Sequence, residues 1–307
     1  MQGQKDLGWV SYAAAGFYSG AVTRALTQPL DVIKTRFQLQ EEPIRGVGGG
    51  KYASLGQALR LIVREEGARS LWKGHVPAQL LSILYGMSQF VTFEEMVRRL
   101  SPPNKVASDG VNFISGTIAG IAAVTCSQPL DVIRTRLIAQ SHRRMVYTNM
   151  RFAVRCILTK EGPMALYNGW LAAVVYVGPY TGINFLIYKF TDRKLKTLQA
   201  KYSLPKKDQL RHFLSGSLAG GIAKIAAYPF DLVKKRLMVM GFEEARVEFG
   251  SVSRYRGTLH CIRHILRREG LLGFYKGLLP SFVKSALTQG LTFFFYEQAC
   301  LLLIEWY

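Results

Sequence analysis

One phrase occurs three times in this sequence at intervals of 100 residues, and it constrains the fold more than any other feature. The copies read PLDVIKTR, PLDVIRTR and PFDLVKKR, and they begin at Pro29, Pro129 and Pro229. Self-similarity at a fixed period indicates that one structural unit is repeated along the chain. We therefore expect three equivalent units that together form one domain. Their predicted boundaries are residues 8–100, 108–198 and 208–304.

A second marker follows each copy of the phrase. It consists of an acid-Gly pair, a short spacer, and then an aromatic residue, a base and a glycine. The copies are Glu66-Gly67 with Trp72-Lys73-Gly74, Glu161-Gly162 with Tyr167-Asn168-Gly169, and Glu269-Gly270 with Tyr275-Lys276-Gly277. Two markers in a constant order indicate that each third of the sequence repeats the same unit. The second unit departs from the pattern, because Asn168 stands where the other units have lysine.

Uncharged runs predict two membrane spans in every unit. The 307 residues could form two soluble domains, and a hydrophobic fraction of 49% does not by itself indicate a membrane protein. Each unit nevertheless has two runs that approach the ~20 residues needed to cross a bilayer, although the last two are short or interrupted. We therefore predict an all-α membrane protein with six transmembrane helices. The runs are residues 7–23, 74–93, 111–130, 170–188, 213–223 and 278–296.

A Gly-x-x-x-Gly pair lies at the same position in the first span of each unit. In an apolar helix, small residues four positions apart allow a neighbouring helix backbone to approach closely. We therefore expect these pairs to form helix-packing faces, and chance recurrence is the alternative. The pairs are Gly16 with Gly20, Gly116 with Gly120, and Gly216 with Gly220.

Each repeated proline is followed by an acid two residues later and a base five residues later. The proline lacks an N–H group and is expected to kink or break the helix. The acid and base, three residues apart, share one helix face. Three such helices around a pseudo-threefold axis would place a ring of charges at one membrane surface, where each acid can meet the base of the next unit. Ordinary juxtamembrane charges are the alternative, but they would explain the bases and not an acid in every copy.

The two markers, in three copies, resemble the mitochondrial carrier family over essentially the whole chain. The resemblance implies six tilted transmembrane helices, a short matrix helix in each unit, and alternating access to one central site in the mitochondrial inner membrane. It also implies a matrix gate of three ion pairs braced by a glutamine. The implied gate residues are Asp31 with Arg134, Asp131 with Lys234, Asp231 with Lys34, and the brace Gln38.

Three cations inside the predicted spans are candidates for binding a substrate, since intramembrane charges are costly and usually functional. Arg24 and Lys224 each lie five residues before a repeat proline. Lys284 is equivalent to Leu81 and Tyr176, at positions that contact substrate in the family. With no acid at the equivalent positions, we expect unpaired cations that attract a phosphorylated anion.

Polar and aromatic side chains near these cations could hold a heterocyclic part of the substrate. For the aromatic residues, plain helix packing is the alternative. The candidates are Gln79, Tyr85, Gln89, Tyr176, Tyr180, Asn184 and Gln289.

Three segments, residues 37–40, 72–79 and 241–246, resemble those family members that carry thiamine pyrophosphate. This resemblance implies exchange of thiamine pyrophosphate for nucleotides or deoxynucleotides. It suits a cavity with cations for the pyrophosphate and aromatic walls for the rings. The cavity chemistry alone leaves adenine nucleotides and coenzyme A as alternatives, although the triple-Arg, triple-Met signature of ADP/ATP carriers is absent.

The family resemblance also implies cardiolipin sites, where N–H groups at helix N-termini meet lipid phosphate. The same resemblance implies that a monomer is sufficient, because the transport pathway runs through one chain. The candidate lipid-binding residues are Trp72, Lys73, Gly74, Tyr167, Gly169, Tyr255, Gly257, Tyr275, Lys276 and Gly277.

Other classes of protein receive little support. His260 and His264 have a spacing that could bind metal, but no acid lies nearby in the sequence, and neither a Walker loop nor a strand-to-helix phosphate fingerprint occurs. The net charge of +20 suggests nucleic-acid binding as an alternative function. Its bases are dispersed among the connecting segments, however, which also suits anionic lipids. We expect a transporter with no enzymatic activity, cofactor, metal or nucleic-acid partner. A uniport carrier of the same fold, which needs no counter-substrate, stays open.

Overall fold

The computed structural model describes residues 9–42, 50–101, 108–140, 145–201, 208–249 and 253–306. These residues form helices and connecting turns, and no strand occurs among them. The prediction of an all-α fold is therefore confirmed. The first predicted unit boundary, residue 8, lies outside the described part of the chain.

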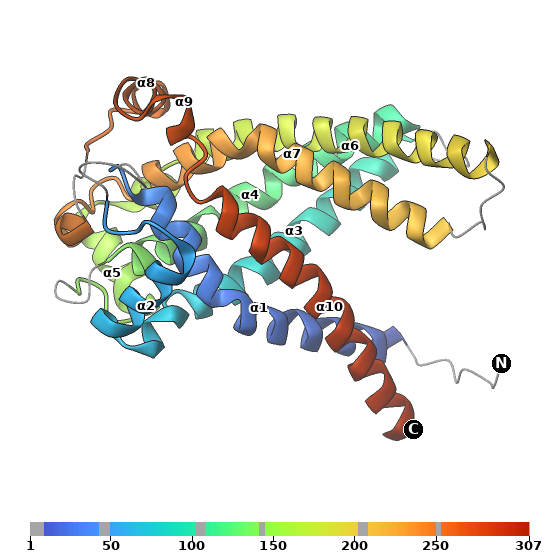
Figure 1. The fold of residues 1–307 in the computed structure, drawn as a ribbon, viewed down its shortest axis with the longest axis horizontal. Helices are drawn as coiled ribbons and strands as arrows, with labels where there is room; N and C mark the ends of the chain where they lie inside the picture. The colour runs from blue at the N-terminus through green and yellow to red at the C-terminus, as the bar shows by residue number, and fades with distance from the viewer. Residues whose placement is uncertain are drawn as a thin grey trace.

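Each unit contributes two long helices to one bundle. In Figure 1 these helices lie close together at the end that carries α2 and α5, here called the narrow end, and spread apart toward the opposite, wide end. Contacts join helices of successive units: α3 packs on α4, α6 on α7, and α10 on α1. The three units therefore close into a ring. The long helices are α1 (Trp9–Leu39), α3 (His75–Leu100), α4 (Asp109–Ala139), α6 (Trp170–Lys201), α7 (Asp208–Met238) and α10 (Leu278–Trp306).

Hydropathy identifies only part of this bundle. Among the described residues, two segments are both long and apolar enough to cross a membrane, Asp109–Ala139 and Pro163–Leu198. The first span of the first unit carries Arg24, and its equivalent in the third unit carries Lys224, so polar side chains lower the mean hydropathy there. The six-helix prediction therefore depends on the threefold repeat, which identifies equivalent helices whatever their individual hydropathy.

Two expectations about the long helices are narrowed by the structure. The sequence predicts a kink or a break at the repeated prolines, and a break does not occur, since α1, α4 and α7 continue for a further nine or ten residues beyond them. The Gly-x-x-x-Gly pairs are also not uniform packing faces. A Cβ atom at Gly120 would lie 2.7 Å from Val177, whereas Gly16, Gly116 and Gly216 face open space. These helices spread apart toward the wide end, so most of the glycines have no close neighbour.

A short amphipathic helix follows the first long helix of every unit, as predicted. These helices are α2 (Leu55–Glu66), α5 (Met150–Lys160) and α8 (Thr258–Arg268). Each buries two residues four positions apart, which share one face of a helix. The buried pairs are Ala58 with Ile62, Ala153 with Ile157, and Cys261 with Ile265.

Short turns of helix complete each unit before its second long helix begins. They are η1 (Ala68–Trp72), η2 (Pro163–Tyr167) and α9 (Gly270–Gly273), and the third unit also has η3 (Glu244–Phe249). The amphipathic helices α2, α5 and α8 each cover one apolar core cluster. A separate cluster joins the three units where α1, α4 and α7 end, and we call it the axial plug. It consists of Leu39, Ala139 and Val239.

Candidate functional site

Three ion pairs connect the units near the narrow end of the bundle. Each joins the acid of one repeated phrase to the base of another, and we call the set the ion-pair ring. Short N–O distances and partial burial make these interactions stronger than exposed surface pairs. The pairs are Asp31–Arg134 at 2.7 Å, Asp131–Lys234 at 2.8 Å and Asp231–Lys34 at 2.8 Å.

Every acid of the ring has a second partner, and the three partners differ. Lys284 of α10 lies 2.6 Å from Asp31. Lys235 of α7 lies 2.7 Å from Asp131. The amide of Gln38 donates to Asp231 at 3.0 Å, as expected of a brace, and also to the hydroxyl of Tyr228 at 3.3 Å. The repeat is therefore symmetric in its primary ion pairs and asymmetric in the groups that support them.

A second set of charges locks the units together beneath the ring. The final arginine of each repeated phrase pairs with the glutamate of the acid-Gly marker in its own unit: Arg36 with Glu66, Arg136 with Glu161, and Arg236 with Glu269. Each arginine also donates its Nε–H to a backbone carbonyl of the next unit. The accepting carbonyls belong to Ile138, Met238 and Gln38, in the same order.

These arginines were not among the residues predicted for the site. The signal was present, because the last base of the first marker and the acid of the second marker occur in all three units. The spacing along the sequence does not show that α2, α5 and α8 fold back to place these glutamates beside the arginines. At most 3% of the surface of Arg36, Arg136 or Arg236 is exposed, so each requires a carboxylate partner in the interior.

All three candidate substrate cations have hydrogen-bond partners, and Lys284 is also in an ion pair, which corrects the expectation that it is unpaired. Lys284 pairs with Asp31. Arg24 donates to the side chain of Gln79 at 3.2 Å. Lys224 donates to the carbonyl of Ser281 at 2.8 Å and to the hydroxyl of Ser285. The physical reason is that a partly buried cation in a polar interior takes the nearest acceptors.

A cavity of about 810 Å³ lies between α6, α7 and α10 and brings several predicted residues together. Lys224 and Gln289 line it, as do Tyr176 and Tyr180, whose rings stack with centroids 5.3 Å apart. The other candidates are fully described, and none of them lines this cavity. Arg24, Gln79, Leu81 and Lys284 are partly buried, and Gln89 is exposed.

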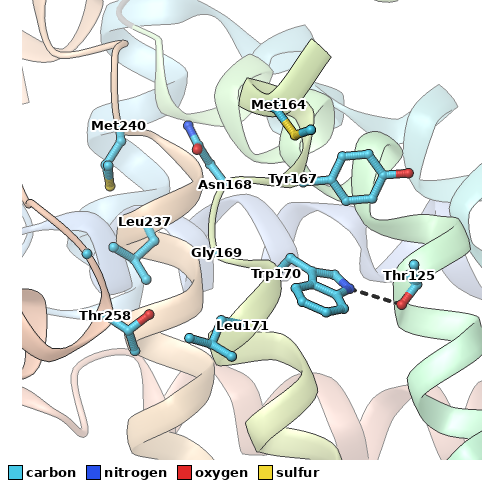
Figure 2. A pocket seen from close by; sticks show the side chains of 11 residues that line it. Thr125, Met164, Tyr167, Asn168, Gly169, Trp170, Leu171, Leu237, Met240 and Thr258 are labelled. Carbon is cyan, nitrogen blue, oxygen red and sulfur yellow. Dashed lines mark hydrogen bonds between the residues drawn. The ribbon is translucent and has the colours of Figure 1, made fainter.

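Two grooves at the unit junctions contain many of the predicted lipid-binding residues. One, of about 600 Å³, is lined by Tyr167, Gly169 and Gly257, and α6 and α8 both begin at its wall. Figure 2 shows this groove, with the indole N–H of Trp170 donating to Thr125. The equivalent groove between the first two units, of about 640 Å³, is lined by Trp72, Lys73 and Gly74.

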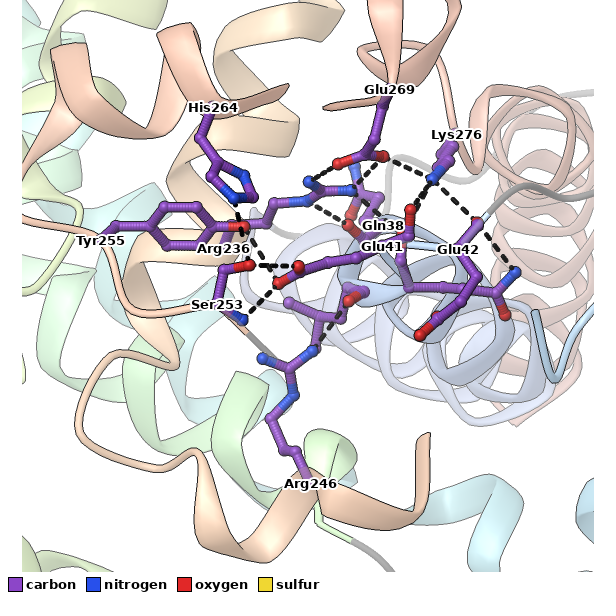
Figure 3. A network of polar contacts seen from close by, with 12 residues as sticks. Gln38, Glu41, Glu42, Arg236, Arg246, Ser253, Tyr255, His264, Glu269 and Lys276 are labelled. Carbon is purple, nitrogen blue, oxygen red and sulfur yellow. Dashed lines mark hydrogen bonds and ion pairs between the residues drawn. The ribbon is translucent and has the colours of Figure 1, made fainter. Parts of the chain in front are cut away.

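At the junction of the third and first units, the predicted lipid-binding side chains are engaged within the protein, as Lys73 is with Glu66 at the first junction. Figure 3 shows that Lys276 contacts Glu269 and the segment directly after α1, where it donates to the carbonyls of Glu41 at 2.7 Å and Glu42 at 2.9 Å. The hydroxyl of Tyr255 donates to the carboxylate of Glu41 at 3.1 Å. Lipid binding by these two side chains stays a prediction.

Comparison with known proteins identifies the family. A family model described as "Mitochondrial carrier protein" matches residues 5–104, 107–199 and 205–305, which are the three units. The chain belongs to the mitochondrial carrier family. The match extends to parts of the chain beyond the repeated markers, and it accounts for the ring-shaped bundle of paired helices described above.

Curated relatives of this carrier are similar along most of their length. The "Mitochondrial thiamine pyrophosphate carrier" of Homo sapiens is 46% identical over 296 residues, which cover 94% of this chain and 90% of the relative. The protein of the same name from Bos taurus is 45% identical, with coverage of 96% and 93%. The "Mitochondrial thiamine pyrophosphate carrier 1" of Phaeosphaeria nodorum is 38% identical, with coverage of 93% and 90%. The resemblance noted in three short segments thus extends over most of the chain.

Membership of this family makes the chain a transporter of a mitochondrial membrane and not an enzyme. Family membership does not assign roles to individual residues. The structure brings the predicted gate residues into contact in pairs, and it brings part of the predicted substrate set into one cavity.

Proposed function

We propose that this carrier exchanges thiamine pyrophosphate for nucleotides across the mitochondrial inner membrane. The observation that carries the proposal is a cavity with a lysine and a stacked tyrosine pair, close to an ion-pair ring. Tyr176 links the cavity to the ring. It lines the cavity, and it interacts electrostatically with Asp231 of the ring. The names of the relatives supply the identity of the cargo.

The residues of the site suit the two chemical halves of thiamine pyrophosphate. Arg24, Lys224 and Lys284 are cations able to bind the pyrophosphate through charge-assisted hydrogen bonds. Tyr176 and Tyr180 offer aromatic faces to the cationic thiazolium ring and the pyrimidine ring. The phosphates of a nucleotide and its base would use the same two groups, so both cargoes of an exchange fit one site.

The ion-pair ring acts in this proposal as the gate of the matrix side. The structure then represents a carrier that is closed toward the matrix at its narrow end. Opening breaks three ion pairs, and binding of the cargo offsets part of that free energy. An empty carrier rarely crosses, because nothing compensates for the broken pairs, and transport becomes an obligatory exchange.

Cardiolipin is a proposed lipid partner at the unit junctions. The two grooves each place the beginnings of two helices at one wall, where backbone N–H groups favour phosphate. Asn168 leaves the second groove without the lysine that Lys73 supplies in the first. We propose a monomer as the functional unit, since the cavity and the ring are built within one chain.

Uptake of labelled thiamine pyrophosphate into liposomes that contain the purified carrier tests the proposal. We expect uptake only when the liposomes hold internal nucleotide or thiamine pyrophosphate. Lys284→Ala is expected to abolish uptake in folded protein, whereas Lys51→Ala, which removes a cation from the narrow-end surface, keeps it. Uptake without any internal substrate would instead indicate a uniporter.

A carrier of another phosphorylated anion is the alternative function. The same cations would bind adenine nucleotides or coenzyme A. Liposomes loaded with each of these compounds separate the two possibilities. Transport of ATP or coenzyme A, together with failure to transport thiamine pyrophosphate, would overturn the proposed cargo and leave the gate proposal in place.

A further inference from the structure

The carboxylate of Asp31 holds two cations with its two oxygen atoms. Oδ2 lies 2.7 Å from the guanidinium of Arg134, which is the expected partner in the ion-pair ring. Oδ1 lies 2.6 Å from the ammonium of Lys284, which belongs to the candidate substrate set. A single side chain therefore joins the proposed gate directly to the proposed cargo site, with no intermediate residue.

The other two units lack this connection. The positions equivalent to Lys284 are Leu81 in the first unit and Tyr176 in the second, and neither carries a charge. The acids Asp131 and Asp231 take their second partners from Lys235 and Gln38, which are residues of the repeated phrases or lie just beyond them. Among these acids, only Asp31 takes its second partner from the candidate substrate cations.

We propose that Asp31 competes with the cargo for Lys284, so that a phosphate on Lys284 removes one of the two cations that hold Asp31 in the closed ring. The proposal rests on the proposed function, because it assigns a switching role to one cation of that site. It makes Asp31 a residue that sets cargo affinity, in addition to its role as a gate acid.

The competition follows from the chemistry of the three groups. A lysine ammonium is a compact charge that binds a carboxylate or a phosphate oxygen in a similar way. Lys284 retains 29% side-chain exposure, so an anion can reach it, whereas Asp31 retains only 13%. Loss of Lys284 leaves Arg134 as the remaining ion-pair partner of Asp31 among the described residues, since Arg24, Lys34 and Lys224 interact with this carboxylate at longer range. Binding of a cargo phosphate to Lys284 would therefore weaken the hold on Asp31 in the ring at the same time.

Binding measurements on purified carrier variants test this inference. Inorganic pyrophosphate is the first probe and thiamine pyrophosphate is the second. Asp31→Asn frees Lys284 and is expected to tighten binding of both probes about fivefold or more. Asp131→Asn and Asp231→Asn remove the same charge from the same ring without freeing Lys284, so they control for the general attraction of anions. We expect clearly smaller gains from these two variants.

A second comparison shows whether Lys284 carries the effect. In a Lys284→Gln background, Asp31→Asn is expected to give no more gain than Asp131→Asn. Equal gains for the three acids, or a specific Asp31 gain that persists in the Lys284→Gln background, would overturn the inference. If the Asp31 pattern holds for pyrophosphate while thiamine pyrophosphate fails to bind the wild type, the competition stands and the proposed cargo is wrong. Asp31→Ser replaces Asp31→Asn if the latter does not give folded protein, as judged by its melting curve.

Discussion

Gly169 lies against the backbone of Lys234, so closely that a Cβ atom at position 169 would stand 2.8 Å from the Lys234 carbonyl oxygen. The glycines of the other aromatic-base-Gly turns have the same relationship to the next unit. Gly74 lies against Arg134 at 3.2 Å and Gly277 against Lys34 at 3.0 Å, measured in the same way. The turn at each junction is therefore in direct contact with the backbone of a base in the ion-pair ring.

Gly169→Ala is expected to destabilise the carrier by about 2–4 kcal/mol, because it combines a steric clash with a left-handed backbone conformation. The φ angle of Gly169 is 79°. Gly162 is a control for positive φ without a clash, since its φ angle is 83°, its ψ angle is 171° and a Cβ atom there meets open space. Gly162→Ala is expected to cost about 1–3 kcal/mol from backbone strain alone. Equal losses of melting temperature in the two variants would contradict the close approach.

Asn168→Lys is expected to stabilise the second unit by about 0.5–1 kcal/mol. In the other units Lys73 and Lys276 pair with Glu66 and Glu269, whose side chains are 3% and 6% exposed. The equivalent Glu161 lacks such a lysine, and 23% of its side chain is exposed. A lysine at position 168 would supply the missing partner.

The measurement for this variant is the melting temperature of the purified carrier at low and high salt. Asn168→Gln lengthens the side chain without adding a charge and serves as the control. A gain for Asn168→Lys that disappears in high salt supports the ion pair. An equal gain for Asn168→Gln would show that packing, and not charge, limits this position.

Arg246→Ala is expected to cost about 1–3 kcal/mol of stability by removing a buried hydrogen bond between the third and first units. Arg246, labelled in Figure 3, is 4% exposed and donates to the carbonyl of Leu39, a residue of the axial plug, at 2.8 Å. Arg254 lies in the same unit with 82% of its side chain exposed. Arg254→Ala should therefore change the melting temperature little, and a similar loss in both variants would refute the structural role of Arg246.

Acidification is expected to destabilise the first unit through Glu66. Burial alone would raise the pKa of Glu66, but the hydrogen bonds and charges of Arg36 and Lys73 outweigh it and lower the pKa below the ordinary 4.5. A carboxylate with a lowered pKa stabilises the fold at pH values above its ordinary pKa, and the contribution is lost as the pH falls through the lowered value.

The measurement is the melting temperature of the carrier from pH 7 down to about pH 3, so that the scan extends below the ordinary pKa of 4.5. Glu66→Gln is expected to lower the melting temperature at pH 7 and to reduce its further fall on acidification. Glu65→Gln is the control, since Glu65 is 42% exposed and pairs with Lys51 at the surface. An acid-induced fall that is unchanged in Glu66→Gln would rule out this glutamate as a source of the pH dependence.

The threefold repeat made the architecture and the primary ion pairs predictable from the sequence. A residue at a fixed offset in one unit has equivalents in the other two, so Asp31, Asp131 and Asp231 could be assigned to one ring from their spacing and the family resemblance. The family resemblance alone implied a short helix in each unit, and α2, α5 and α8 are those helices. The sequence also shows single-residue departures from the repeat. Asn168 is one of them, and the glutamate of its unit, Glu161, is more exposed than Glu66 and Glu269.

What could not be predicted depends on contacts between units that the repeat does not encode. Lys284 has no charged equivalent, so its bond to Asp31 follows only from the packing of α10 against α1. The Gly-x-x-x-Gly prediction failed for a related reason, because sequence spacing cannot show how far the helices separate toward the wide end. Arg246 lies in η3, for which the described parts of the other two units have no counterpart, and periodicity therefore gives no information about it.

The contacts of Arg36, Arg136 and Arg236 with carbonyls of the next unit form a closed cycle, in which the first unit holds the second, the second holds the third and the third holds the first. A cycle has no terminal member, so every unit both donates one of these hydrogen bonds and accepts one. Two units without the third would leave one arginine with no carbonyl to bind and one carbonyl with no arginine. All three units of this chain are therefore needed to satisfy every member of the observed cycle.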